Sequence, residues 1–173
     1  MSTLTVKELA APTGYDLKIA SGETLDLKSQ GTVTMPAGAV LQVVQGGNGS
    51  AVSTTSESWQ ATTLTATITP SSTSSKILIN YSSNSYQADN GQGASTIYRG
   101  STELTGHSDG CTKNWKDGSR GVSPHIGSWL DSPNTTSATT YTIYFRSISG
   151  ASMDFPTNQS TTFSHITLME IAG

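Results

Sequence analysis

The sequence predicts an all-β protein in which an N-terminal stem or arm of short repeated strands precedes an antiparallel β-sandwich or jelly-roll knob. Apolar doublets recur every eight residues between positions 17 and 43, and longer segments of alternating polarity follow from position 64. No segment keeps a 3.6-residue apolar period over three turns. A chain of 173 residues can hold one domain of ordinary size and an appendage.

Each apolar doublet predicts a short strand that shows one face to a core, because side chains alternate across a strand. Glycine-containing turns separate the doublets. A strand of three or four residues cannot bury its own face, so cover must come from elsewhere. The rest of the chain would supply it in an ordinary meander; we favour three chains wound around a common axis. The predicted trimer core consists of Leu17, Ile19, Leu25, Leu27, Val33, Met35, Leu41 and Val43.

A glycine-rich segment after this repeat predicts the domain boundary. Residues 45–50 read QGGNGS, a composition typical of flexible linkers. The predicted organisation is therefore an arm or stem over 1–45, a linker over 46–52 and a β-sandwich knob over 53–173.

The knob is predicted to contain strands at 64–68, 76–81, 96–99, 102–104, 141–146 and 163–171. The segment 76–81 is apolar on both faces, which predicts a central strand. Gly100 and Ser101 indicate a two-residue hairpin turn between the third and fourth segments. Strands at this spacing with turns between them are typical of a sandwich.

Residues 105–135 are predicted to form a long loop region, because Gly, Asp, Ser and Pro are dense there. Long structured loops in β domains commonly carry binding sites. The candidate surface for a glycan or an acidic partner consists of Lys113, Trp115, Lys116, Arg120 and Trp129, since aromatic planes beside cations suit both. The alternative is that both tryptophans cover the sandwich core.

Catalytic, metal and cofactor signals are weak. His107, Asp109 and Cys111 alternate by two and could face one metal ion, but the more ordinary interpretation is surface loop residues with a half-buried thiol. His125 and His165 are interpreted as packing residues. The sequence has no nucleophile elbow, phosphate loop or dinucleotide fingerprint, so no cofactor is expected and an enzyme is not favoured.

Composition excludes several other classes. Charged residues make up 12% of the chain and the net charge is −3, which argues against a nucleic-acid-binding face. A single cysteine, Cys111, excludes an intrachain disulfide. The N-terminus shows no signal-peptide pattern and no apolar run approaches membrane-spanning length, so we expect a soluble protein made in a cytoplasm.

Three segments resemble virion structural proteins of tailed bacteriophages, especially those of aquatic and cyanobacterial hosts. They are MPAGAVLQVVQ at 35–45, ITPSSTSSKILI at 68–79 and HITLMEIAG at 165–173. These motifs are structural and low in complexity, and the resemblance spans most of residues 35–173. It implies a β-sandwich knob, a homotrimer and a place on the virus particle.

The expected function is that of a trimeric capsid decoration or cement protein, which stabilises the shell by binding junctions of the major capsid protein. The alternative is a trimeric tail-fibre or receptor-binding tip that recognises host surface glycans and contacts other tail proteins. Both place the protein in the virion after synthesis in the host cytoplasm, with neither nucleic acid nor membrane insertion.

Overall fold

The computed structural model describes residues 13, 21, 35–47, 50–157 and 163–173. The chain divides between Thr34 and Met35, and the fold described below begins at Met35. The eight predicted stem residues therefore fall into two groups: Leu17, Ile19, Leu25, Leu27 and Val33, and then Met35, Leu41 and Val43. The first five lie outside the described residues, whereas Leu41 and Val43, like Met35, lie within them.

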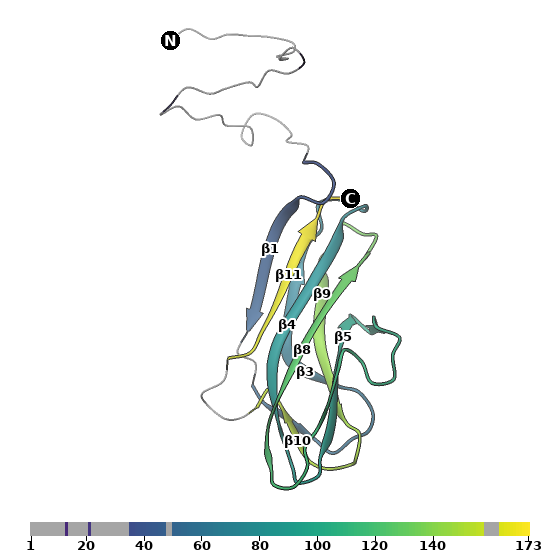
Figure 1. The fold of residues 1–173 in the computed structure, drawn as a ribbon. Helices are drawn as coiled ribbons and strands as arrows, with labels where there is room; N and C mark the ends of the chain where they lie inside the picture. Colours follow the sequence, from purple (N-terminus) through teal and green to yellow (C-terminus); the bar gives the residue numbers. More distant parts are fainter. Residues whose placement is uncertain (1–12, 14–20, 22–34, 48–49, 158–162) are drawn as a thin grey trace. The chain divides into compact units, whose positions relative to one another are not determined.

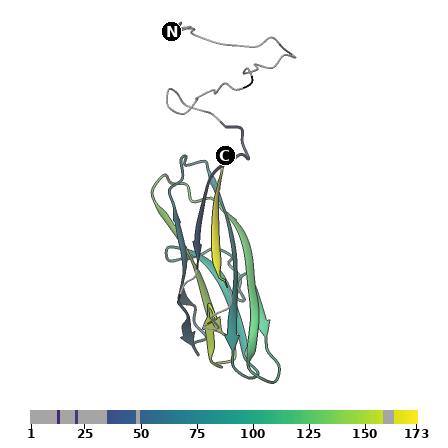
Figure 2. The same ribbon diagram turned by 90° about the vertical axis from the view of Figure 1, so that its left-hand side faces the viewer.

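The described chain is all-β, in two antiparallel sheets that form a sandwich (Figures 1 and 2). No helix occurs among the described residues, and so none of the length and hydropathy needed to cross a membrane is found there. The larger sheet contains β1 (Val40–Gly47), β2 (Val52–Thr54), β4 (Lys76–Gln87), β8 (Gly121–Asp131), β10 (Met153–Phe155) and β11 (His165–Ile171). The smaller contains β3 (Gln60–Ile68), β5 (Gln92–Arg99), β6 (Thr102–Glu103), β7 (Thr112–Trp115) and β9 (Thr139–Ser147).

Strand β4 organises the larger sheet. One of its edges pairs with β8 over its whole length, from Ile77 opposite Asp131 to Gln87 opposite Gly121. Its other edge pairs first with β11 and then with the short β10. Beyond β11 lies β1, so that β1, β11 and β4 run side by side (Figure 1). The central strand predicted at 76–81 is confirmed and continues to Gln87.

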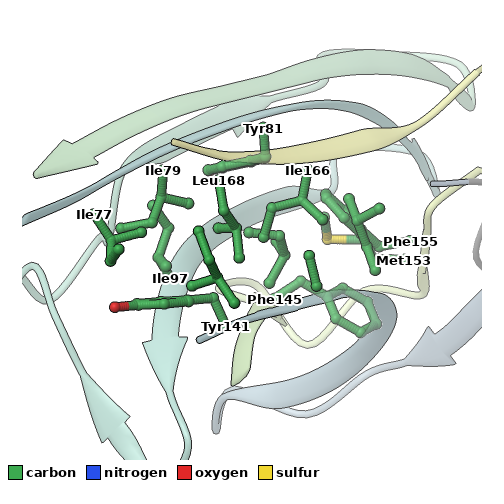
Figure 3. Close-up of a cluster of buried hydrophobic side chains, with 14 residues drawn as sticks. Ile77, Ile79, Tyr81, Ile97, Tyr141, Phe145, Met153, Phe155, Ile166 and Leu168 are labelled. Carbon is green, nitrogen blue, oxygen red and sulfur yellow. The ribbon is translucent and has the colours of Figure 1, made fainter. Parts of the chain in front are cut away.

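The core lies between the inner faces of the two sheets. Side chains of β4 and β11 meet those of β5 and β9, as Figure 3 shows for Ile79, Leu168, Ile97 and Phe145. The alternation predicted for β9 is confirmed, because Tyr141, Ile143 and Phe145 are fully buried. Burial of such side chains contributes roughly 1.5–3 kcal/mol each, which makes this layer the main source of stability.

The predicted hairpin at residues 96–104 is present. Tyr98 pairs with Glu103 and Arg99 with Thr102, so β5 and β6 enclose a two-residue turn. Gly100 at its first position has φ +55°, a conformation that favours glycine.

The glycine-rich segment that predicted the linker belongs in part to the sandwich. Gly46 and Gly47 complete β1, opposite Ile166 and His165 of β11. A Cβ on Gly46 would lie 2.1 Å from the carbonyl oxygen of Thr65, so glycine is needed there for close approach to β3. The second compact unit begins at Met35, before the linker that the glycine-rich composition predicted at 46–52.

The prediction of a long loop over 105–135 is wrong for most of its second half. Residues 121–131 form β8, one of the longest strands, and 112–115 form β7. The strand was missed because its pattern is reversed: Ser123, His125 and Asp131 face the interior, and apolar side chains face outward. Gly127 completes the inner face, where the ring of Tyr81 occupies the space that a Cβ would fill.

Candidate functional site

The last apolar doublet of the sequence repeat lies exposed on β1. Leu41 is 36% exposed and Val43 is 56% exposed, although the strand that carries them is hydrogen-bonded to β11. A β-bulge between Val40 and Gln42 leaves Val40 exposed as well. Met35, from the preceding doublet, is also exposed. Leu41 and Val43 thus lie on a strand of the sandwich with their side chains partly exposed, and the shared trimer core predicted for them stays a prediction.

A second apolar set on the same sheet was not predicted. Val122, Ile126 and Leu130 of β8 are 46%, 64% and 51% exposed. Their signal in the sequence is the period-two alternation V-x-P-x-I-x-S-x-L from 122 to 130, which the surrounding Gly, Ser and Pro residues obscured. The larger sheet therefore carries exposed apolar side chains on both β1 and β8.

The three segments that carry the resemblance meet at Glu170 of β11. The amide of Gln42 donates to Glu170 Oε2 at 2.6 Å and to the carbonyl oxygen of Thr69 at 2.7 Å. The Ser71 amide, the Ser71 hydroxyl and the Ser75 hydroxyl donate to Glu170 Oε1 at 2.6–2.7 Å. Burial opposes ionisation, but these hydrogen bonds outweigh it and hold the pKa of Glu170 at about 2. The carboxylate thus joins β1, the β3–β4 turn and β11.

The predicted glycan or partner surface is not one surface. Trp115, on β7, is 70% exposed, whereas Trp129, on β8, is half-buried against the core. The prediction that both tryptophans act alike, as binding surface or as core cover, is therefore replaced by a division between them. Arg120 lies over the Tyr86 ring at 5.2 Å, on the larger sheet. Lys116 packs against Gly121.

Lys113 shares β7 with Trp115 and is paired with an acidic side chain. Its ammonium lies 3.1 Å from Asp109 Oδ2, and Asp109 also lies 3.7 Å from the Arg146 guanidinium. Arg146 in turn lies over the Trp59 ring at 4.9 Å. Of the predicted surface, Lys113 and Trp115 therefore remain together on β7, both exposed, beside the Asp109–Arg146–Trp59 group.

His107, Asp109 and Cys111 do not converge on a metal-binding geometry. No cluster of three or more metal-ligating side chains occurs in the described part of the chain. Asp109 is engaged with Lys113 and Arg146, while Cys111 is half-buried against the core. Burial raises the pKa of the Cys111 thiol, which favours the unreactive protonated form.

His125 lies fully buried in a chain of hydroxyl groups. Its Nε2 lies 3.0 Å from Ser85 Oγ and its Nδ1 lies 2.8 Å from Ser95 Oγ, which in turn contacts the Tyr81 hydroxyl at 2.8 Å. Burial lowers the pKa of His125 to about 3, so the ring is neutral, with one nitrogen donating and the other accepting. The interpretation of His125 as a packing residue is confirmed. His165, by contrast, lies on the outward side of β11 and stacks with Phe163.

A second polar cluster joins the two sheets at Asp131. The Arg99 guanidinium donates to both carboxylate oxygens at 2.8–2.9 Å, and the Tyr141 hydroxyl donates to Oδ2 at 2.7 Å. Burial and the neighbouring carboxylate raise the pKa of Tyr141, so its hydroxyl remains a donor. The buried polar residues His125 and Asp131 on the inner face of β8 therefore serve the structure, because both hydrogen-bond to side chains of the smaller sheet.

The chain was compared with protein-family models and with curated proteins, and neither comparison finds a match.

Proposed function

We propose that this chain is a structural protein of a bacteriophage particle, a homotrimeric capsid decoration or cement protein that stabilises the shell by binding junctions of the major capsid protein. Its role is to bind and assemble, without catalysis. The proposal includes the finer architecture expected from the sequence, an octad stem followed by a jelly-roll knob, and a location in the virion.

The exposure of Leu41 and Val43 is the observation that carries the proposal. An eight-residue strand that pairs with β11 at every position except the bulged Leu41 has no need of large apolar side chains on its solvent side. Full burial of such a side chain contributes roughly 1.5–3 kcal/mol, and association between copies recovers the fraction of it that partial exposure forgoes. A trimer also supplies stability without a disulfide, as suits a chain whose single cysteine is half-buried.

The junction at Glu170 supports a structural interpretation of the resemblance. Gln42, Ser71 and Ser75 come from the motif segments, and the side chain of each donates a hydrogen bond to the buried Glu170 carboxylate. The motifs thus hold the entry of β1 against the end of β11, which is an architectural task.

Two measurements test the proposal. Sedimentation equilibrium of the full chain is expected to give three copies per particle. Quantitative mass spectrometry of purified virions of the phage that encodes the chain is expected to give hundreds of copies per particle, as capsid decoration requires. A monomer, or absence from the virion, would overturn the proposal. Deletion of residues 1–15 is expected to leave a folded trimer that no longer cosediments with expanded empty capsids.

The exposed Trp115 favours a second candidate, a tail-fibre tip that recognises host surface glycans. An indole 70% exposed beside Lys113 suits stacking against a sugar ring. A glycan array is expected to give binding that Trp115→Ala abolishes. The control is Thr67→Ala, at an exposed position of β3 in the same sheet, which is expected to preserve binding. Copy numbers in the teens per virion would agree with this candidate and disagree with capsid decoration.

A further inference from the structure

One apolar row crosses four neighbouring strands on the outer face of the larger sheet. Val43 of β1 lies opposite Met169 of β11, Met169 opposite Leu78 of β4, and Leu78 opposite Leu130 of β8. Side chains at paired positions point to the same side of a sheet, and strands lie about 4.8 Å apart. The row is therefore a continuous apolar band that spans about 14 Å from β1 to β8.

The reversed pattern of β8 indicates that a partner covers this outer face, which is exposed in the single chain. A strand between core and water normally buries its apolar side chains and exposes its polar ones. In β8 the buried positions are Ser123, His125 and Asp131, while Ile126 and Leu130 point outward. Contiguous apolar side chains on an outer face are typical of an interface.

The charge of the face favours another copy of the chain as the occupant. Along β1, β4, β8 and β11, Lys76 is the one outward-facing residue with a full charge, and it lies at one end of β4. Arg120, which precedes β8, adds a second cation over the Tyr86 ring near the other end of β4. A nearly uncharged face offers no recognition to a strongly charged partner and meets itself without repulsion. Leu41 and Val43 are also the last doublet of the repeat that is predicted to assemble with sister copies, so the face continues that predicted interface.

The width of the face suits three copies around one axis. Four strands make a face about 19 Å wide, and three such faces turned inward enclose a triangle whose sides lie about 5.5 Å from its centre. Sheets that pack face to face are about 10 Å apart, or about 5 Å on each side of the midplane. Side chains of ordinary length therefore fill the centre of such a prism.

We propose that the outer face of the larger sheet, over β1, β11, β4 and β8, is the surface through which three copies contact one another, with the Val43–Met169–Leu78–Leu130 row as an apolar layer around the axis. This inference rests on the proposed homotrimer and names its contact face. The adjacent row, Gln45, Thr167, Asn80 and Ser128, supplies amides and hydroxyls at the next level of the prism.

A pair of matched substitutions in the full chain tests the contact face. Leu130→Glu places a carboxylate in the apolar row, and Ala61→Glu places one at an exposed position on β3, on the outer face of the smaller sheet. Sedimentation velocity is expected to show that Leu130→Glu raises the chain concentration needed for half-assembly at least tenfold. Ala61→Glu is expected to assemble like the unsubstituted chain.

Hydroxyl-radical footprinting of the unsubstituted trimer gives a second measurement that does not depend on how a variant folds. Met169 and Leu130 are expected to be protected, whereas Trp115 is labelled strongly. A trimer in which Met169 is labelled as fast as in dissociated chains, or which Leu130→Glu leaves intact, overturns the contact face and leaves the proposed function standing. An unsubstituted chain that sediments as a monomer overturns the proposed function itself, and one that sediments as a dimer overturns both the proposed homotrimer and the three-fold prism.

Discussion

The two outer faces of the sandwich differ in how their side chains are satisfied. On the smaller sheet, threonine hydroxyls pair across strands: Thr65 lies 3.1 Å from Thr142 and Thr67 lies 2.7 Å from Thr140. On the larger sheet, Val43 and Leu130 stand exposed at the two ends of an apolar row. Around these threonines, away from Trp115 on β7, the first face is suited to water as it stands, whereas the second gains free energy when it is covered.

This difference shows that stability and assembly are assigned to opposite sides of one strand. The inner side of β8 carries His125 and Asp131, which bond to groups of the smaller sheet and hold the sandwich together. Its outer side carries Ile126 and Leu130, which contribute little to the isolated fold. Substitutions on the inner side should therefore change stability, and those on the outer side should change assembly.

The largest effect is expected for Asp131→Ala. The substitution removes two hydrogen bonds from the partly exposed Arg99 guanidinium and leaves the buried Tyr141 hydroxyl without its acceptor, which together cost about 3 kcal/mol. Urea unfolding at a fixed chain concentration measures the loss. The control is Asp109→Ala, because the exposed Asp109–Lys113 pair is expected to contribute less than about 1 kcal/mol. Equal losses for the two variants would contradict a structural role for the Asp131 cluster.

An intermediate effect is expected from the protonation of His125. Its folded-state pKa of about 3 lies below the ordinary value of 6.5, so the unfolded chain binds a proton first as the pH falls. The stability that the neutral ring contributes is present above pH 6.5 and is lost progressively as the pH falls from there toward 3. Between pH 7 and pH 5, this linkage lowers the free energy of unfolding by about 2 kcal/mol.

The variant His125→Gln isolates that contribution. It is less stable than the unsubstituted chain at pH 7, because the hydroxyl chain through Ser85 and Ser95 is disturbed. Its stability is expected to change about 2 kcal/mol less between pH 7 and pH 5, as measured by urea unfolding at both values. An unchanged pH dependence would mean that the pKa of His125 is the same in the folded chain as in the unfolded chain, and would contradict its burial as a neutral ring.

Much of the fold follows from alternating patterns in the sequence. The strands around Ile77, Tyr141 and Ile166 combine inward apolar residues with turns at their ends, so propensity and burial agree. Strand β8 could not be found in this way, since its burial is decided by polar partners on distant strands. Asp131 is buried because Arg99 and Tyr141 lie opposite, and the local sequence pattern of β8 does not reveal partners that are distant in the sequence.

The candidate site was predictable in part for the same reason. Leu41 and Val43 were identified because a repeat marks them, and their exposure agrees with a need for cover. Leu130 was not identified, because its place in the apolar row depends on the register of β8 against β4. Trp115 and Trp129 are similar in the sequence, yet Trp115 lies on β7 of the smaller sheet and is exposed, whereas Trp129 lies on β8 of the larger sheet and packs against the core.

The smallest effect is expected for Thr67→Val, which tests whether the hydroxyl-covered face is independent of assembly. Valine keeps the β-branched shape and removes the hydroxyl that contacts Thr140. Because that pair is exposed, water replaces the lost partner, and the free energy of unfolding should change by less than about 1 kcal/mol. Sedimentation should show the same trimer as for the unsubstituted chain, in contrast to Leu130→Glu. A loss of assembly in Thr67→Val would place an interface on the smaller sheet and remove the distinction between the two faces. Exchange of one hydroxyl for a methyl group on a surface covered only by water cannot otherwise change the association of the chains.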